Sequence, residues 1–139
     1  MDIQHLVNQC YERLPEYMKA KPWEYTEHGR KVLQTEDELN AYIAAYGEMH
    51  IVKCRAALQN FPYDILNVYS YEIFDWGCGQ GLATLTFLEM LQQRGNLSKL
   101  QRIYLIEPSS YALSRATNWV KLSVGPGIEV VAINKYISK

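Results

Sequence analysis

The chain has 139 residues, 48% of them hydrophobic, and its formal net charge is −1. This size suits one domain with a buried core, and the near-neutral charge argues against a basic nucleic-acid-binding surface over the whole protein. The N-terminus lacks the pattern of a signal peptide, and no apolar run approaches the roughly 18 residues that span a bilayer. Three cysteines without a CxxC pair argue against a disulfide scaffold or a zinc site. We therefore expect a soluble cytoplasmic protein that has no metal site and no contact with membranes.

The first part of the chain, residues 1–64, has the pattern of a helical segment. Apolar side chains recur at three- and four-residue steps over residues 3–18 and predict a helix, which Pro15 kinks or splits. Residues 20–34 contain proline and glycine between polar side chains, and this composition indicates an irregular connection.

A second helix is predicted to begin after Thr35. This residue is a good N-cap, three acidic residues follow it in the first turn, and Glu38 completes a capping-box pattern. The helix is expected to continue to about Asn60, because Phe61-Pro62 opposes its extension.

The second part, residues 65–139, alternates between strand and helix patterns. In chain order we expect a strand over 71–75, a helix over 82–94, a strand over 102–107, a helix over 111–123 and a strand over 128–133. This alternation predicts parallel strands joined by right-handed helical crossovers. The predicted fold class is therefore α/β, with a partial Rossmann-like parallel sheet (β-α-β-α-β) preceded by the N-terminal helical segment.

The strongest functional signal is Asp75-Trp76-Gly77-Cys78-Gly79-Gln80-Gly81, between a predicted strand and a predicted helix. Glycines at a strand-to-helix turn permit tight backbone angles and close approach of a ligand. The start of the next helix offers free backbone N–H groups to that ligand. We expect Trp76 to pack beneath the loop and Cys78 to be a small loop residue, because no neighbouring base or cation would make it a nucleophile.

Two classes of cofactor compete for this loop. A dinucleotide fingerprint is G-x-G-x-x-G, whereas the spacing here is G-x-G-x-G, with Leu82 where the third glycine would stand. Asp75 would repel a pyrophosphate but would attract an ammonium group. S-adenosylmethionine (SAM) carries an α-ammonium group and no phosphate, so electrostatics favours SAM over NAD.

Glu107 is the second candidate site residue, at the end of the next predicted strand. A carboxylate there can accept hydrogen bonds from both ribose hydroxyls of a nucleoside. Glu107 lies 26 residues after Gly81 (107 − 81), which leaves room for one helix, a loop and one strand.

The stretch from Asp75 to Gly81, together with Glu107, resembles the class I SAM-dependent methyltransferases. Phe74–Gly81 matches their first motif, D/E-x-G-x-G-x-G, and Ile106-Glu107-Pro108-Ser109 resembles their acidic second motif. The resemblance covers roughly residues 70–134. It implies that the cofactor-binding residues are Asp75, Gly77, Cys78, Gly79, Gly81 and Glu107.

The chain departs from this family at its C-terminal end. A complete class I domain has seven strands, and only Asn134 stands near the position of the adenine-contacting residue after the third. The fourth strand, which carries the substrate-facing motif in many members, is absent. We therefore expect the cofactor-binding portion of a truncated, catalytically incomplete methyltransferase. We also expect self-association through the edge of strand 71–75, which the missing strand would otherwise cover.

The methyl acceptor stays open at this point. The leading helices and the two motifs resemble ribosome-associated RNA methyltransferases, which favours RNA over a protein or a small molecule. A non-catalytic SAM-binding interaction module is the main alternative. A nicotinamide-dependent oxidoreductase is disfavoured by the glycine spacing.

Overall fold

The computed structural model describes residues 2–136 and has an α/β architecture. In chain order its elements are α1 (Ile3–Glu12), α2 (Glu16–Lys19), the 3₁₀ helix η1 (Pro22–Gly29), α3 (Glu36–Leu58), the 3₁₀ helix η2 (Tyr63–Asn67), β1 (Tyr71–Trp76), α4 (Leu82–Gln93), β2 (Leu100–Ile106), α5 (Ser110–Val124) and β3 (Glu129–Ile133). The three strands form one parallel sheet in the order β1-β2-β3. The predicted partial parallel sheet with an N-terminal helical segment is confirmed.

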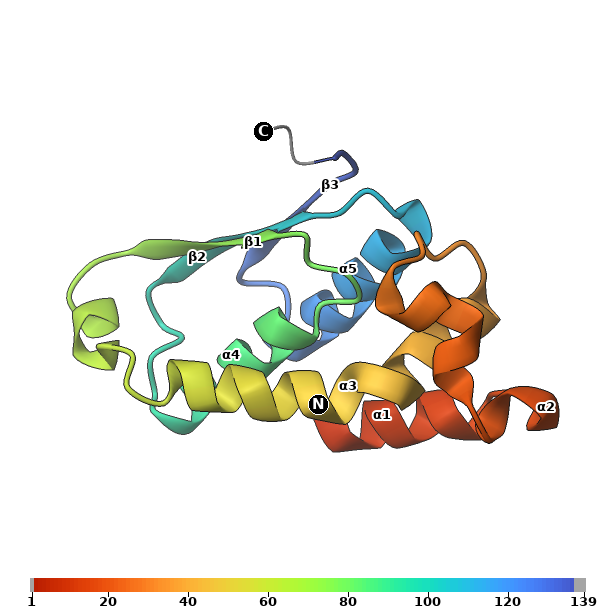
Figure 1. Cartoon of the computed structure of the whole chain (residues 1–139). Coiled ribbons are helices and arrows are strands. Elements are labelled where there is room, and N and C mark those ends of the chain that lie inside the picture. The colour runs from red at the N-terminus through yellow and green to blue at the C-terminus, as the bar shows by residue number, and fades with distance from the viewer. Residues whose placement is uncertain (1, 137–139) are drawn as a thin grey trace.

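The elements form layers on one side of the sheet. Helices α4 and α5 pack against the sheet, and α3 and α1 lie beyond them, as Figure 1 shows. One hydrophobic cluster runs through these layers, with Ile3 from α1, Ile43 from α3, Leu88 from α4, Ile103 from β2 and Val120 from α5. Residues 2–64 and 65–136 therefore contribute to a common core, and α3 is held close to the loop that follows β1.

The N-terminal helices begin and end for the reasons that the sequence suggests. Pro15 separates α1 from α2. At the start of α3 the capping box is complete: Glu38 N–H donates to the Thr35 hydroxyl, and Thr35 N–H donates to Glu38 Oε1, each at 3.1 Å. The helix ends at Leu58, two residues before the predicted end.

The connection over residues 20–34 contains 3₁₀ turns but is irregular between them, because Thr26, Glu27 and His28 have non-helical backbone angles. Residues 22–29 form η1, which begins at Pro22, a residue whose fixed φ suits a first helical position. The buried Thr26 hydroxyl then stabilises it, donating to Trp23 O at 3.1 Å and accepting from Gly29 N–H at 3.2 Å. The predicted irregular connection is therefore confirmed in part, and the 3₁₀ turns within it were not predicted from composition.

The second face of the sheet carries no helix within residues 2–136 (Figure 1). Along β1 the residues alternate, so that Glu72, Phe74 and Trp76 are exposed on this face. Phe74 stacks on Tyr104 of β2, with ring centroids 4.2 Å apart and planes 7° from parallel. Trp76 is 56% exposed, so the expectation that it packs beneath the loop is wrong. The reason is strand alternation, which points it to the opposite face from Asp75.

None of the helices within residues 2–136 combines the length and the hydropathy that crossing a membrane requires.

Candidate functional site

The loop after β1 is a tight turn that glycines make possible. Gly77, Gly79 and Gly81 have φ values of 69°, 54° and 89°, a region that side chains with a Cβ avoid. The N–H groups of Gly77 and Cys78 both donate to Ile106 O, at 2.8 and 3.0 Å, and this ties the loop to the end of β2. The sequence signal for a strand–loop–helix turn therefore corresponds to a real structural unit.

Two of these glycines serve different purposes. A Cβ on Gly81 would lie 3.1 Å from the Cβ of Ala116, so Gly81 allows α4 to pack closely on α5. A Cβ on Gly79 would meet no atom within 4 Å. The space beside Gly79 is therefore open to a ligand, whereas Gly81 acts through packing.

Asp75 is a mostly buried carboxylate at the end of β1. Burial raises the pKa of Asp75, and hydrogen bonding by Thr84 partly opposes that rise. The Thr84 hydroxyl donates to Asp75 Oδ2 at 2.6 Å. A carboxylate held in this way is costly to ionise unless a cation neutralises it, so its environment suits a positively charged ligand group.

Glu107 follows the end of β2 and is fixed by two backbone donors. Gly79 N–H donates to Glu107 Oε1 at 3.1 Å, and Ser109 N–H donates to Oε2 at 2.7 Å. Asn134, after β3, donates through Nδ2 to the carbonyl oxygens of Glu107 and Pro108, both at 2.9 Å. Each carboxylate oxygen keeps further accepting capacity, because an ionised carboxylate has about four lone-pair positions.

Two cavities flank the glycine loop and share Tyr42, Gly77, Gly79 and Gln80 as lining residues. The first, which we name the Asp75 cavity, has a volume of about 140 Å³ and is also lined by His50 of α3. The second, the Glu107 cavity, has a volume of about 250 Å³. Together they fall within the ~300–1,000 Å³ range of small-molecule sites.

The helical segment before β1 closes both cavities from one side. Gln80, in the loop, is buried, and its Nε2 donates to Leu39 O in α3 at 2.9 Å. Arg115 of α5 donates from Nη1 to Gln80 Oε1 at 3.1 Å and to Asn40 Oδ1 at 2.8 Å. The Ser109 hydroxyl also donates to Leu33 O. These contacts fix the start of α3 over the glycine loop.

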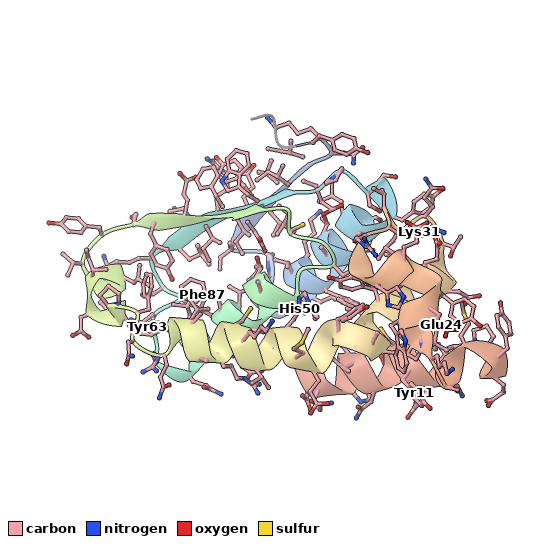
Figure 2. All side chains as sticks on the ribbon, in the orientation of Figure 1. Tyr11, Glu24, Lys31, His50, Tyr63 and Phe87 are labelled. Carbon is pink, nitrogen blue, oxygen red and sulfur yellow. The ribbon has the colours of Figure 1, made fainter. Side chains whose placement is uncertain are left out.

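The same contacts bring two side chains to the site that the motifs did not identify. Tyr42 and His50 reach it from α3, and Figure 2 labels His50 on the side of α3 that faces α4. Neither residue belongs to the glycine motif or to the acidic motif around Glu107. Their spacing of eight residues, about two helical turns, is the signal that could have linked them.

Cys78 lies in the loop as a protonated thiol. Burial, and then the charges of Asp75 and Glu107, raise the pKa of Cys78 to about 12. A thiol with so high a pKa is a poor nucleophile near neutral pH, in agreement with the interpretation of Cys78 as a small loop residue.

Two larger cavities are also present, and the one along β1 shares Asp75 with the Asp75 cavity. One, of about 350 Å³, lies between α1, the start of α3 and α5, and includes Arg13, Glu36 and Trp119 among its lining residues. The other, of about 390 Å³, follows the edge of β1 and is mainly apolar. Volume does not identify the functional site here, because the buried carboxylate and the open glycine backbone meet only at the loop.

Comparisons of the chain with models of protein families, with curated proteins and with solved structures found no match. Within the described residues no group of three or more histidine, cysteine or acidic side chains is arranged to hold a metal ion.

The raised pKa of Asp75 makes a stability prediction. Because its pKa in the folded state lies above the ordinary value of 3.8, Asp75 destabilises the fold at neutral pH, and this cost disappears as the pH falls to 3.8 and below. Asp75→Asn keeps an acceptor for the Thr84 hydroxyl and removes the charge. We expect the variant to be more stable than the wild type at about pH 7 and nearly equal to it at about pH 3.5 in urea denaturation. A difference in stability that does not vary with pH would contradict this account of Asp75.

Proposed function

We propose that this chain binds SAM through the glycine loop and is the cofactor-binding portion of a methyltransferase. The observation that carries the proposal is the meeting of the Asp75 cavity and the Glu107 cavity at the open backbone of Gly79. SAM has an ammonium group at one end and a ribose near its middle. The proposed site offers a buried carboxylate for the first and a backbone-fixed carboxylate for the second.

The charges at the loop favour SAM over a dinucleotide. A pyrophosphate bound at the start of α4 would lie close to both Asp75 and Glu107. Each of these carboxylates lines a cavity that also includes Gly79, and Glu107 accepts a hydrogen bond from Gly79 N–H. Two carboxylates repel a doubly charged anion. An ammonium group, in contrast, is attracted by a carboxylate and lowers the pKa of that carboxylate. This argument adds to the glycine spacing and does not depend on it.

The proposed role explains why no acid–base pair is needed in these residues. The sulfonium of SAM already activates the methyl group, and the protein mainly aligns the acceptor and excludes water. The resemblance assigns acceptor-facing groups to a fourth strand, so the described residues are proposed to bind the cofactor rather than the acceptor. The alternative function, a non-catalytic SAM-binding module, would use the same site. An assay of methyl transfer from labelled SAM distinguishes the two, because such a module would transfer no methyl group.

RNA as the methyl acceptor rests on the resemblance alone. Lys53 and Arg55 form a basic pair on α3, but Arg55 Nη2 lies 2.9 Å from Glu89 Oε1 in an ion pair. A cytoplasmic location is proposed from the cysteine usage, and Cys10, Cys54 and Cys78 are free thiols in the structure.

Self-association through the edge of β1 is also proposed, with a second copy of this chain as the occupant. β1 lies at one edge of the sheet, where its outer backbone groups face no strand within residues 2–136. An apolar groove follows that edge and includes Phe61 and Phe87, whose rings pack edge to face at 5.5 Å; Figure 2 labels Phe87 there. A two-fold axis perpendicular to β1 at this edge would pair β1 antiparallel with its own copy and bury both grooves, as an isologous dimer requires.

Titration calorimetry tests the SAM proposal with S-adenosylhomocysteine and NAD as ligands. We expect the first to bind and NAD to show no binding at millimolar concentration. Gly79→Ala should weaken binding of S-adenosylhomocysteine about tenfold or more, because its Cβ would enter the open space beside the loop. It should also cost about 1–2 kcal/mol of stability, from its positive φ.

Gly95→Ala is the matched control for that experiment. Gly95 also has a positive φ, 70°, and open space around it, but it lies at the opposite end of α4 from the loop. This variant should lose similar stability and keep the affinity of the wild type. Equal affinity of Gly79→Ala and the wild type, or preference for NAD, would refute the proposed site.

Sedimentation velocity tests the proposed dimer. Phe74→Lys places a charge beside the β1 edge and should shift a concentration-dependent dimer to monomer, because an edge lysine opposes strand pairing. Leu122→Lys, at a 72% exposed position on α5, is the control and should leave the dimer intact. A monomeric wild type whose β1 amides are fully protected from hydrogen exchange would argue against the dimer.

A further inference from the structure

The Asp75 cavity contains one charged group that the glycine motif explains and one titratable group that it does not. Asp75 and the first residues of α4 line part of the cavity, and α3 contributes Tyr42, Ile43 and His50 to the lining. The motif accounts for a cation-binding carboxylate. It does not account for a histidine on a separate helix that faces the same small space.

His50 is held in place by packing rather than by hydrogen bonding. Its ring lies edge-on to the ring of Tyr42, with centroids 5.8 Å apart and planes at 79°. Among the described residues neither ring nitrogen of His50 has a hydrogen-bond partner. The half-buried imidazole therefore presents an unused donor and acceptor to the cavity that it lines.

The charged and titratable groups around His50 come from three elements. Lys53 lies one turn further along α3, Asp75 ends β1, and Cys78 belongs to the loop. Burial and then the charge of Lys53 lower the pKa of His50, so the empty site holds a neutral imidazole near pH 7. A neutral imidazole still donates one N–H hydrogen bond and can bind a carboxylate, and the Tyr42 hydroxyl is a second side-chain donor that lines this cavity.

The amino-acid end of SAM is a zwitterion, and it needs one partner for each charge. Asp75 provides the anion, because its buried carboxylate suits an ammonium group. Cys78 is a protonated thiol and a weak donor, and Asp75 repels a carboxylate. Tyr42 and His50 are the donor side chains that remain, and Tyr42 also borders the Glu107 cavity, whereas His50 lines only the Asp75 cavity. This placement assigns the negative end of the ligand to His50.

We propose that His50 binds the carboxylate of the methionine end of SAM while Asp75 binds its ammonium group. This inference rests on the proposed function. It makes α3 part of the cofactor site and predicts that the protein selects ligands that carry an α-carboxylate. Tyr42 is a positioning residue, which fixes the His50 ring by edge-to-face packing.

The test compares SAM with decarboxylated S-adenosylmethionine, which keeps the sulfonium and the ammonium group but lacks the carboxylate. The wild type should bind SAM about 10- to 100-fold more tightly, the range expected for a hydrogen bond to a charged group. His50→Ala should lose most of that preference by weakening SAM alone. His50→Gln, which restores a neutral donor, should recover part of it.

His5→Ala is the matched control, because His5 is exposed on α1 and bonds only Gln9 within that helix. It should leave both affinities unchanged, and thermal melting of every variant confirms that it is folded. If SAM binds equally well to the wild type, His50→Ala and His50→Gln, the role of His50 is refuted while the proposed function stands. If the wild type binds neither ligand, both proposals are refuted.

Discussion

The hydrogen bond from Gly79 N–H to Glu107 Oε1 joins the two parts of the candidate site. It links a loop that follows β1 to a carboxylate that follows β2, and the register of the parallel strands makes it possible by pairing Trp76 with Ile106. Parallel strands place their carboxyl ends at one edge of the sheet, where ligands of open α/β folds bind. The Asp75 and Glu107 cavities open on either side of this bond because the same strand ends position both carboxylates.

The second constraint is the polar network that fixes α3 over the loop. Gln80 and Arg115 are both satisfied by partners on α3, through Leu39 O and Asn40 Oδ1. Replacing any member would leave buried polar groups without partners, which costs more than the bond itself contributes. The orientation of α3, and so the position of Tyr42 and His50, follows from this network as much as from apolar packing. The helical segment is therefore part of the site rather than an appendage to it.

Local patterns were sufficient to predict much of this arrangement. The capping box at Thr35, the break at Pro15 and the strand–glycine–helix turn are interactions between residues close in sequence, and each is present in the structure. Glu107 was found for a similar reason, because a carboxylate at a strand end next to a glycine loop has few structural alternatives. The parallel order of the strands followed from the alternation of elements alone.

The features that the sequence did not predict have both local and long-range causes. The segment over 22–29 folds around the buried Thr26 hydroxyl, and Trp76 is exposed because alternation along β1 takes it away from Asp75. The role of α3 could not be inferred, because Gln80 and Leu39 are 41 residues apart and the bond between them has no local signature. The spacing of Tyr42 and His50 on one helix could have predicted that they lie on the same face. It could not have predicted that this face lies beside Asp75.

The most direct test of the central claim is a backbone amide NMR titration with S-adenosylhomocysteine. The account predicts that the largest shifts occur at Gly77, Gly79 and the amides after Glu107, with smaller shifts on α3 around Tyr42 and His50. Shifts concentrated instead at the cavity between α1 and α5, around Arg13 and Trp119, would contradict it, as would the absence of any shift at Gly79.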